Sequence, residues 1–157
     1  MKEQESNDNP GVIAFPPMIY GSALLIGLAI HYFIAIKFLA GAHSIWLGAL
    51  LISVAGPVIL SAVHTIHRAQ TAFDLRKPTT SIVTEGAFRL SRNPAYLALT
   101  LLYLGIASLI NSIWVLLMVV PTVIVMHRGV IKREERYLER KFGEEYLRYK
   151  EQVRRWI

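Results

Sequence analysis

Two polar clusters flank the longest uncharged stretch of this chain. The first holds Arg92-Asn93-Pro94 within residues 86–96, and the second holds Glu134-Glu135 on a basic segment. An arginine at a helix N-terminus binds a carboxylate or phosphate, helped by the free amides of the first turn. A carboxylate at the edge of a membrane attracts a cation in a medium of reduced dielectric. The two clusters therefore predict a site for a small polar ligand at the water boundary.

Each cluster also has a purely structural interpretation, which the sequence leaves open. Glu134 and Glu135 are compatible with a solvated helix surface, on which Glu135 pairs with Lys132 at a spacing of three residues. Arg89 and Arg92 are compatible with simple topology anchors at a membrane boundary. A ligand site requires instead that the two clusters become neighbours in space.

The distribution of charge indicates which elements must position these clusters. Hydrophobic residues make up 54% of the 157 positions, and the mean hydropathy is +0.40. No lysine, arginine, aspartate or glutamate occurs within residues 9–36, 38–67 or 93–126. Such segregation is typical of bilayer spans rather than of a soluble core.

We predict an all-α integral membrane protein that forms a single domain over residues 1–157. It has about four transmembrane helices and a C-terminal amphipathic helical cap on the cytosolic side. The expected spans, after a mobile tail of residues 1–10, are residues 18–36, 45–63, 94–110 and 113–126. Pro57 and Pro121 predict kinks. The cap leaves the membrane near Gly129, and Gly143 predicts a helix stop within it.

The last two spans are short for a full double crossing. Their 34 uncharged residues, 93–126, give about 51 Å of helix, whereas two crossings of the hydrocarbon core need about 60 Å. The shortage places Arg92, Asn93, His127 and Arg128 at headgroup depth. The basic segments 64–93 and 127–157 predict that both termini face the cytoplasm. Short loops and compact size favour a prokaryotic inner membrane.

Composition argues against several other classes of site. The net charge of +6 comes from basic residues that flank apolar runs, where they set topology and meet anionic lipids rather than nucleic acid. The absence of cysteine excludes disulfides and thiolate metal sites. His64 and His67 at a spacing of three residues are too few ligands to predict a metal site, and we expect none.

The ordered motifs resemble the isoprenylcysteine carboxyl methyltransferase family and its relatives, the membrane phospholipid N-methyltransferases. The resemblance covers about residues 80–153, or roughly half of the chain. The matching pieces are Gly86-Ala-Phe88 through Arg92-Asn93-Pro94-Ala-Tyr96, then Glu134-Glu135-Arg-Tyr-Leu138, then Phe142-Gly143-Glu-Glu-Tyr146-Leu-Arg-Tyr149. Asn93 stands where many members have histidine. The chain ends without the family's Val-Pro-Arg-x-x-Pro sequence, which suggests a shorter C-terminal cap.

The resemblance implies a methyltransferase that uses S-adenosylmethionine in a cytosol-facing pocket and takes a lipophilic acceptor from the bilayer. Arg92 and Glu134 are the candidate catalytic residues that it implies, with Glu134 attracting the ammonium or sulfonium and Arg92 pairing with the carboxylate. The cofactor-binding residues that we expect are Gly86, Arg92, Asn93, Pro94, Tyr96, His127, Arg128, Glu134 and Glu135.

The acceptor stays open between a prenylcysteine-type carboxylate, a phospholipid and another small lipid-like molecule. No unambiguous base is visible, which favours a carboxylate, a thiol or an already neutral acceptor. Two other functions remain as alternatives. One is a sterol-type membrane reductase that uses NADPH, and the other is a membrane accessory protein without turnover.

Overall fold

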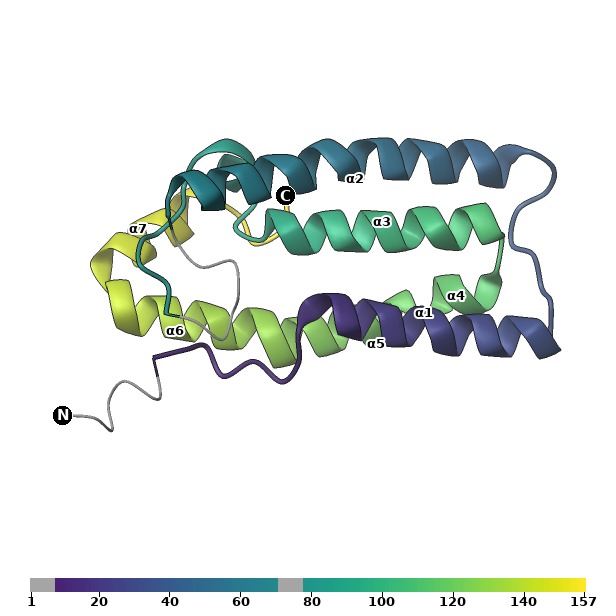
Figure 1. The fold of residues 1–157 in the computed structure, drawn as a ribbon, viewed down its shortest axis with the longest axis horizontal. Helices are drawn as coiled ribbons and strands as arrows, with labels where there is room; N and C mark the ends of the chain where they lie inside the picture. The colour runs from purple at the N-terminus through teal and green to yellow at the C-terminus, as the bar shows by residue number, and fades with distance from the viewer. Residues whose placement is uncertain (1–7, 71–77) are drawn as a thin grey trace.

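The computed structural model describes residues 8–70 and 78–157, and every regular element in these ranges is helical. The elements are α1 (Pro16–Phe33), α2 (His43–Arg68), the 3-10 turn η2 (Gly86–Arg89), α3 (Pro94–Ile110), α4 (Ile113–Leu117), α5 (Val119–Met126), the π-helical turn η3 (His127–Ile131), α6 (Lys132–Phe142) and α7 (Glu144–Gln152). The long helices run side by side along one axis (Figure 1). The predicted all-α membrane fold class is thus confirmed.

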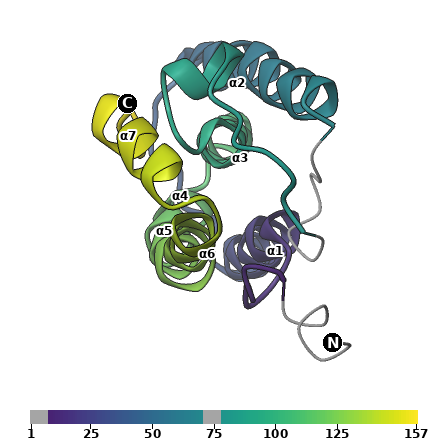
Figure 2. The ribbon, with the colours of Figure 1, turned by 90° about the vertical axis from the view of Figure 1, so that its left-hand side faces the viewer.

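In the described part of the chain, three helical runs are long and apolar enough to cross a bilayer: Pro16–Phe33, His43–Arg68 and Ile113–Phe142. Helix α3 has 17 residues, or about 26 Å of helix, which is less than the thickness of the hydrocarbon core. The predicted number of four spans is therefore not confirmed. Helix α3 occupies the middle of the bundle, between α2 on one side and α1 with α4 on the other (Figure 2).

Local sequence explains both ends of α3. Pro94 occupies its first turn, where the missing N–H of proline costs nothing and its fixed φ suits the helix. Asn111 ends the helix in the left-handed conformation at φ 55°, which asparagine tolerates better than most residues. The Asn111 side chain then accepts hydrogen bonds from the amides of Phe38 (3.2 Å) and Leu39 (3.0 Å), and so joins the two turns at this end of the bundle.

The last long helical run is continuous from α4 to α6, with two local irregularities. The break between α4 and α5 falls at Met118, three residues before Pro121, whose missing N–H removes one helical hydrogen bond. The turn η3 widens to π geometry at His127–Ile131. Helix α6 continues the same helical run to Phe142, in keeping with the predicted amphipathic extension beyond Gly129.

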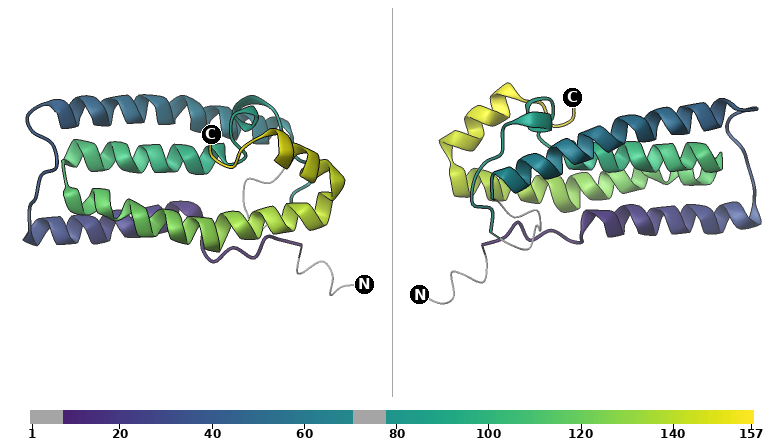
Figure 3. Two further views of the ribbon diagram at one scale, coloured as in Figure 1. Left: turned by 180° about the vertical axis from the view of Figure 1, so that it is seen from behind. Right: turned by 45° about the horizontal axis from the view of Figure 1, so that its top comes forward.

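The segments that flank the spans gather at one end of the bundle. There lie residues 78–93, α6, α7 and the C-terminal residues, whereas residues 34–42 and the Asn111 turn lie at the other end (Figures 1 and 3). Gly143 has a φ of 53° and separates α6 from α7, as predicted. The antiparallel hairpin thus returns both polar clusters to the same end.

The N-terminal segment, residues 8–15, packs along η3 and α6. The Ile13 amide donates to the Gly129 carbonyl at 3.2 Å, and Asp8 binds both Tyr137 (2.8 Å) and Lys141 (2.6 Å). Asp8, which lies in the predicted mobile tail, thus contacts α6. Residues 1–7 of that tail, and residues 71–77 of the predicted basic segment, lie outside the described residues.

Glycines allow the helices to approach closely. A Cβ on Gly27 of α1 would lie 2.8 Å from the backbone Cα of Val115 in α4. A Cβ on Gly48 of α2 would lie 2.8 Å from the carbonyl oxygen of Gly105 in α3. Small residues at such crossings are the usual device of membrane helix packing, because they let dispersion contacts form between backbones.

We expect Gly27→Val to destabilise the fold, because Val115 backbone atoms cannot move out of the way as a side chain can. Overpacking of this kind costs about 1–3 kcal/mol, which corresponds to roughly 3–10 °C in the melting temperature. Gly21→Val in the same helix is the matched control, because a Cβ on Gly21 meets nothing within 4 Å. Equal melting temperatures of the two variants in detergent would contradict the proposed α1–α4 contact.

Candidate functional site

A cavity of about 190 Å³ lies at the end of the bundle where the polar clusters meet. Its walls come from the start of α1, from α2, from the segment before α3, and from α3, α6 and α7. The lining residues are Phe15, Pro16, Pro17, Ile59, Ile66, Thr79, Ser81, Ile82, Val83, Phe88, Arg92, Asn93, Pro94, Ala95, Tyr96, Leu99, Glu134, Glu135, Leu138, Tyr146 and Tyr149. The cavity has a polar side around Arg92 and Glu134 and a largely apolar remainder.

Tyr96 and Glu134 join the two sequence clusters directly. Pro94 starts α3, and this places Tyr96 in the first turn of the helix, where its side chain is buried. The Tyr96 hydroxyl donates a hydrogen bond of 2.7 Å to Oε2 of Glu134. Within the described residues no cation lies at ion-pair distance from the partly buried Glu134 carboxylate. Glu134 is thus a cavity-lining carboxyl group without a counter-charge in the described part of the chain.

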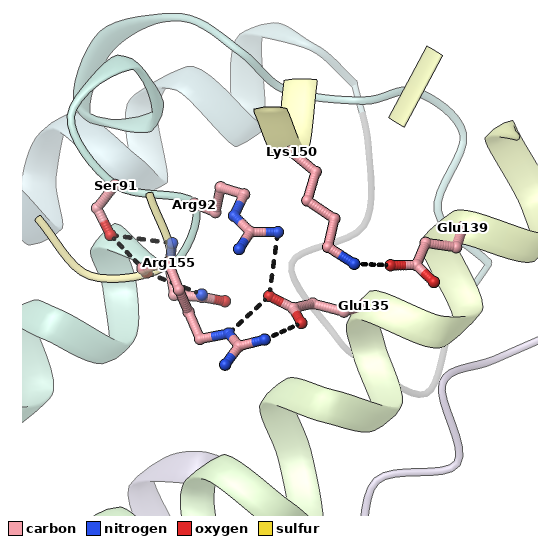
Figure 4. Close-up of polar contacts among 7 residues, drawn as sticks. Ser91, Arg92, Glu135, Glu139, Lys150 and Arg155 are labelled. Carbon is pink, nitrogen blue, oxygen red and sulfur yellow. Dashed lines mark hydrogen bonds and ion pairs between the residues drawn. The ribbon is translucent and has the colours of Figure 1, made fainter. Parts of the chain in front are cut away.

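Glu135 has the opposite environment, with an arginine on each side (Figure 4). Arg155 donates to it through two parallel bonds, Nε to Oε1 at 2.9 Å and Nη2 to Oε2 at 2.7 Å. Arg92 approaches Oε1 through Nη1 at 3.3 Å. The hydrogen bonds to Glu135 raise the pKa of Arg155, so the Arg155 guanidinium stays charged.

The Arg92 guanidinium is held nearly out of solvent, with its side chain 8% exposed. Its Nε and Nη1 atoms are buried and make no hydrogen bond, although Nη1 belongs to the ion pair with Glu135. Buried donors are rarely left without an acceptor, because the lost hydration costs about 1–3 kcal/mol. Arg92 therefore offers donors to an anionic ligand in the cavity.

The C-terminal residues after α7 are fastened to the start of α3. The Arg92 amide donates to the Arg154 carbonyl at 2.9 Å. The Ser91 hydroxyl and the Asn93 side-chain amide both donate to the Arg155 carbonyl at 3.1 Å. Asn93, where the resembling family often has histidine, thus uses its amide to hold the end of the chain.

Helix α7 closes another wall of the cavity with two tyrosines. The Tyr149 hydroxyl donates to the Phe88 carbonyl at 2.7 Å, which ties α7 to η2. Burial raises the pKa of Tyr146, and the nearby Glu135 carboxylate raises it further. The Tyr146 phenol is therefore neutral in this pocket and acts as a hydrogen-bonding group.

Six of the nine predicted cofactor residues line this cavity, and they are Arg92, Asn93, Pro94, Tyr96, Glu134 and Glu135. Gly86 does not, because it turns against α2 with a φ of 57°, and a Cβ there would lie 2.5 Å from Oγ1 of Thr65. His127 and Arg128 lie in η3 outside the lining residues, and Arg128 is exposed. These three residues are placed to shape or flank the site.

Arg155 and the Phe15-Pro16-Pro17 wall were not predicted as site residues. The signal for Arg155 was weak but present, because the family ending has an arginine two residues after a valine, and Arg155 follows Val153 in the same way. Phe15, Pro16 and Pro17 carry no signal of their own. They reach the cavity because residues 8–15 dock on α6 and thereby fix the start of α1.

Sequence similarity to known proteins covers much of the chain, including both polar clusters. The sequence profile described as phospholipid methyltransferase matches residues 43–145, which is more than half of the chain. A protein of Haemophilus influenzae described as uncharacterized is 44% identical over 62 residues, covering 40% of this chain and 98% of that relative. No solved structure matches the chain.

The matched range contains α2, α3, the fourth helical run and both polar clusters, so it includes the cavity's charged side. This family belongs to a superfamily of membrane methyltransferases that also contains the isoprenylcysteine carboxyl methyltransferases. Its activity is methyl transfer in the membrane to lipid-like substrates. The predicted resemblance is confirmed: this chain is a member of the phospholipid methyltransferase family.

Proposed function

We propose that this protein transfers a methyl group from S-adenosylmethionine to a lipophilic acceptor at the membrane–water interface. The observation that carries the proposal is a pair of incompletely partnered groups in one cavity. Arg92 offers buried donors without an acceptor, and Glu134 offers a carboxylate without a cation among the described residues. A zwitterionic, positively charged ligand satisfies both groups at once.

The charged side of the cavity fits the amino-acid half of this cofactor. Arg92 binds the carboxylate, and Glu134, oriented by Tyr96, faces the ammonium or sulfonium. When bound, S-adenosylmethionine supplies a methyl group on a positively charged sulfur. The chain's own contribution is to orient this group and to exclude water, because alignment and a dry site account for most of the acceleration in such transfers.

The apolar side of the cavity fits a lipophilic acceptor. It is formed by apolar residues of α1, α2, α3 and the segments that flank them, namely Phe15, Pro17, Ile59, Ile66, Ile82, Val83 and Leu99. The acceptor classes remain a prenylcysteine-type carboxylate, a phospholipid or another small lipid-like molecule. We place this end of the bundle, with both termini, at the cytoplasmic face of a prokaryotic inner membrane, because the flanking segments are basic.

The NADPH-dependent reductase is less well supported by the cavity. A nicotinamide dinucleotide phosphate carries several negative charges, and such ligands are bound by multiple arginines, lysines or backbone amides. Arg92 is the one cationic residue among the described residues that line the cavity. The accessory alternative predicts instead that the cavity binds neither nucleotide.

The test is ligand binding by the purified protein in detergent. S-adenosylhomocysteine at about 100 times its dissociation constant is expected to raise the melting temperature by roughly 5–10 °C. A shift with NADPH and none with S-adenosylhomocysteine would replace the proposal by the reductase, and no shift with either would favour the accessory role. Membranes given methyl-labelled cofactor, total lipid extract and prenyl thiol acids would then identify the acceptor by its label.

A further inference from the structure

Glu135 makes unequal contacts with its two arginines. Arg155 donates hydrogen bonds to both carboxylate oxygens, at 2.9 and 2.7 Å, in the bidentate geometry that guanidinium and carboxylate favour. Arg92 stands 3.3 Å from one of the same oxygens and makes no hydrogen bond through Nε or Nη1. The hydrogen bonds to the carboxylate thus come from the arginine outside the cavity lining, while the arginine that lines the cavity keeps two buried N–H groups without a hydrogen-bond acceptor.

We infer that Arg155 is a positioning residue that holds Glu135 and thereby keeps the donors of Arg92 available for a ligand carboxylate. The inference deepens the proposed function and rests on it. It assigns selectivity for the amino-acid end of the cofactor to a residue that is not in the cavity wall. Arg155 comes from the C-terminal residues, whose backbone is fixed independently by Ser91 and Asn93.

Arg155 keeps Arg92 available because the two arginines compete for one buried carboxylate, that of Glu135. Glu135 is 6% exposed, and a buried carboxylate needs charge-assisted partners. Without the Arg155 side chain, Arg92 is the cation that remains at ion-pair distance from Glu135 among the described residues, and it needs to close only a small gap to become a hydrogen-bonded partner. The group of Arg92, Arg155 and Glu135 would also lose its net positive charge. Both effects weaken the binding of a carboxylate and leave the rest of the cavity unchanged.

The experiment measures the affinity of full-length protein in detergent for two nucleosides. One is S-adenosylhomocysteine, and the other is 5′-deoxy-5′-(3-aminopropylthio)adenosine, which keeps the amine and lacks the carboxylate. Arg155→Gln is expected to weaken S-adenosylhomocysteine binding at least about tenfold, because a charge-assisted hydrogen bond is lost to competition. The affinity for the decarboxylated nucleoside is expected to stay within about twofold.

Two variants separate positioning from a structural role of the C-terminal residues. Arg154→Gln removes the same charge from the neighbouring exposed arginine and should leave both affinities unchanged. Arg155→Lys retains the charge but offers one contact instead of a fork, and should restore part of the lost affinity.

Equal weakening of both nucleosides by Arg155→Gln would mean a merely structural role and would overturn the inference, as would no change in either. The proposed function would survive both results, since the wild-type protein would still bind S-adenosylhomocysteine. If the wild-type protein binds neither nucleoside, the proposed function fails and this inference fails with it.

Discussion

Glu134→Gln is expected to weaken the binding of S-adenosylmethionine at least about 30-fold. This factor corresponds to about 2 kcal/mol, the cost of removing one partner of a charge pair that is buried from solvent. The substitution keeps the shape of the side chain and its contact with the Tyr96 hydroxyl while it removes the charge. Isothermal calorimetry or a thermal shift series in detergent measures the effect. Methyl transfer at low cofactor concentration should fall by a similar factor.

A second ligand refines this result. S-adenosylhomocysteine lacks the positive charge on sulfur, so a larger loss for S-adenosylmethionine would place Glu134 near the sulfonium. An equal loss for both ligands would place it near the ammonium. Glu144→Gln is the matched control, because it removes the same charge from an exposed position on α7. Unchanged affinity of the Glu134 variant for both ligands would mean that the charged pocket is misassigned.

The ligand-free Glu134 variant should be at least as stable as the wild type. A carboxylate with one hydrogen bond and no cation among the described residues is costly to bury, so its neutral replacement relieves the folded state. Lower affinity together with an unchanged or higher melting temperature is the signature of a group retained for ligand binding rather than for folding.

Arg92→Gln is expected to reduce the affinity for S-adenosylhomocysteine by about 30-fold or more, because a nearly buried guanidinium contributes about 2 kcal/mol or more to a carboxylate that it binds. Glu135 keeps its forked pair with Arg155 in this variant, so the substitution does not leave a second charge unpaired. Titration of the purified variant with the nucleoside gives the dissociation constant.

The same variant should bind the decarboxylated nucleoside almost as well as the wild type does, since that ligand has no group for Arg92. Arg89→Gln is the control, because Arg89 is exposed in η2 and lies outside the cavity lining. If the affinities for both nucleosides fell by the same factor, the role of Arg92 would be structural, at the start of α3, rather than contact with the ligand carboxylate. In that case the carboxylate must bind elsewhere.

Several features of the fold were predictable from short stretches of sequence. Pro94 fixes the start of α3, Asn111 its end, and Gly143 the turn between α6 and α7. These positions depend on backbone dihedral preferences that each residue carries regardless of its partners. The return of both polar clusters to one end follows similarly, because an uncharged run of this length in a bilayer must form a hairpin.

Other features depended on contacts between segments that are distant in sequence. Docking of residues 8–15 on α6 depends on the fit of Ile13 over Gly129, and no local sequence pattern predicts this contact. The same holds for Gly86, which packs on Thr65 and not in the cavity.

By itself the sequence determined that this is a helical membrane protein with Arg92 and Glu134 at the same end of a hairpin, because hydrophobic run lengths and turn residues act locally. Only the tertiary structure decided which carboxylate is neutralised. Glu134 and Glu135 are adjacent in sequence, yet among the described residues Glu135 is bound by Arg155 and Arg92, whereas Glu134 is bound by the Tyr96 hydroxyl alone. The two side chains point in different directions from the helix, and the residues after α7 bring Arg155 to Glu135. A carboxylate is paired only with the charged groups that folding places within about 3 Å of it.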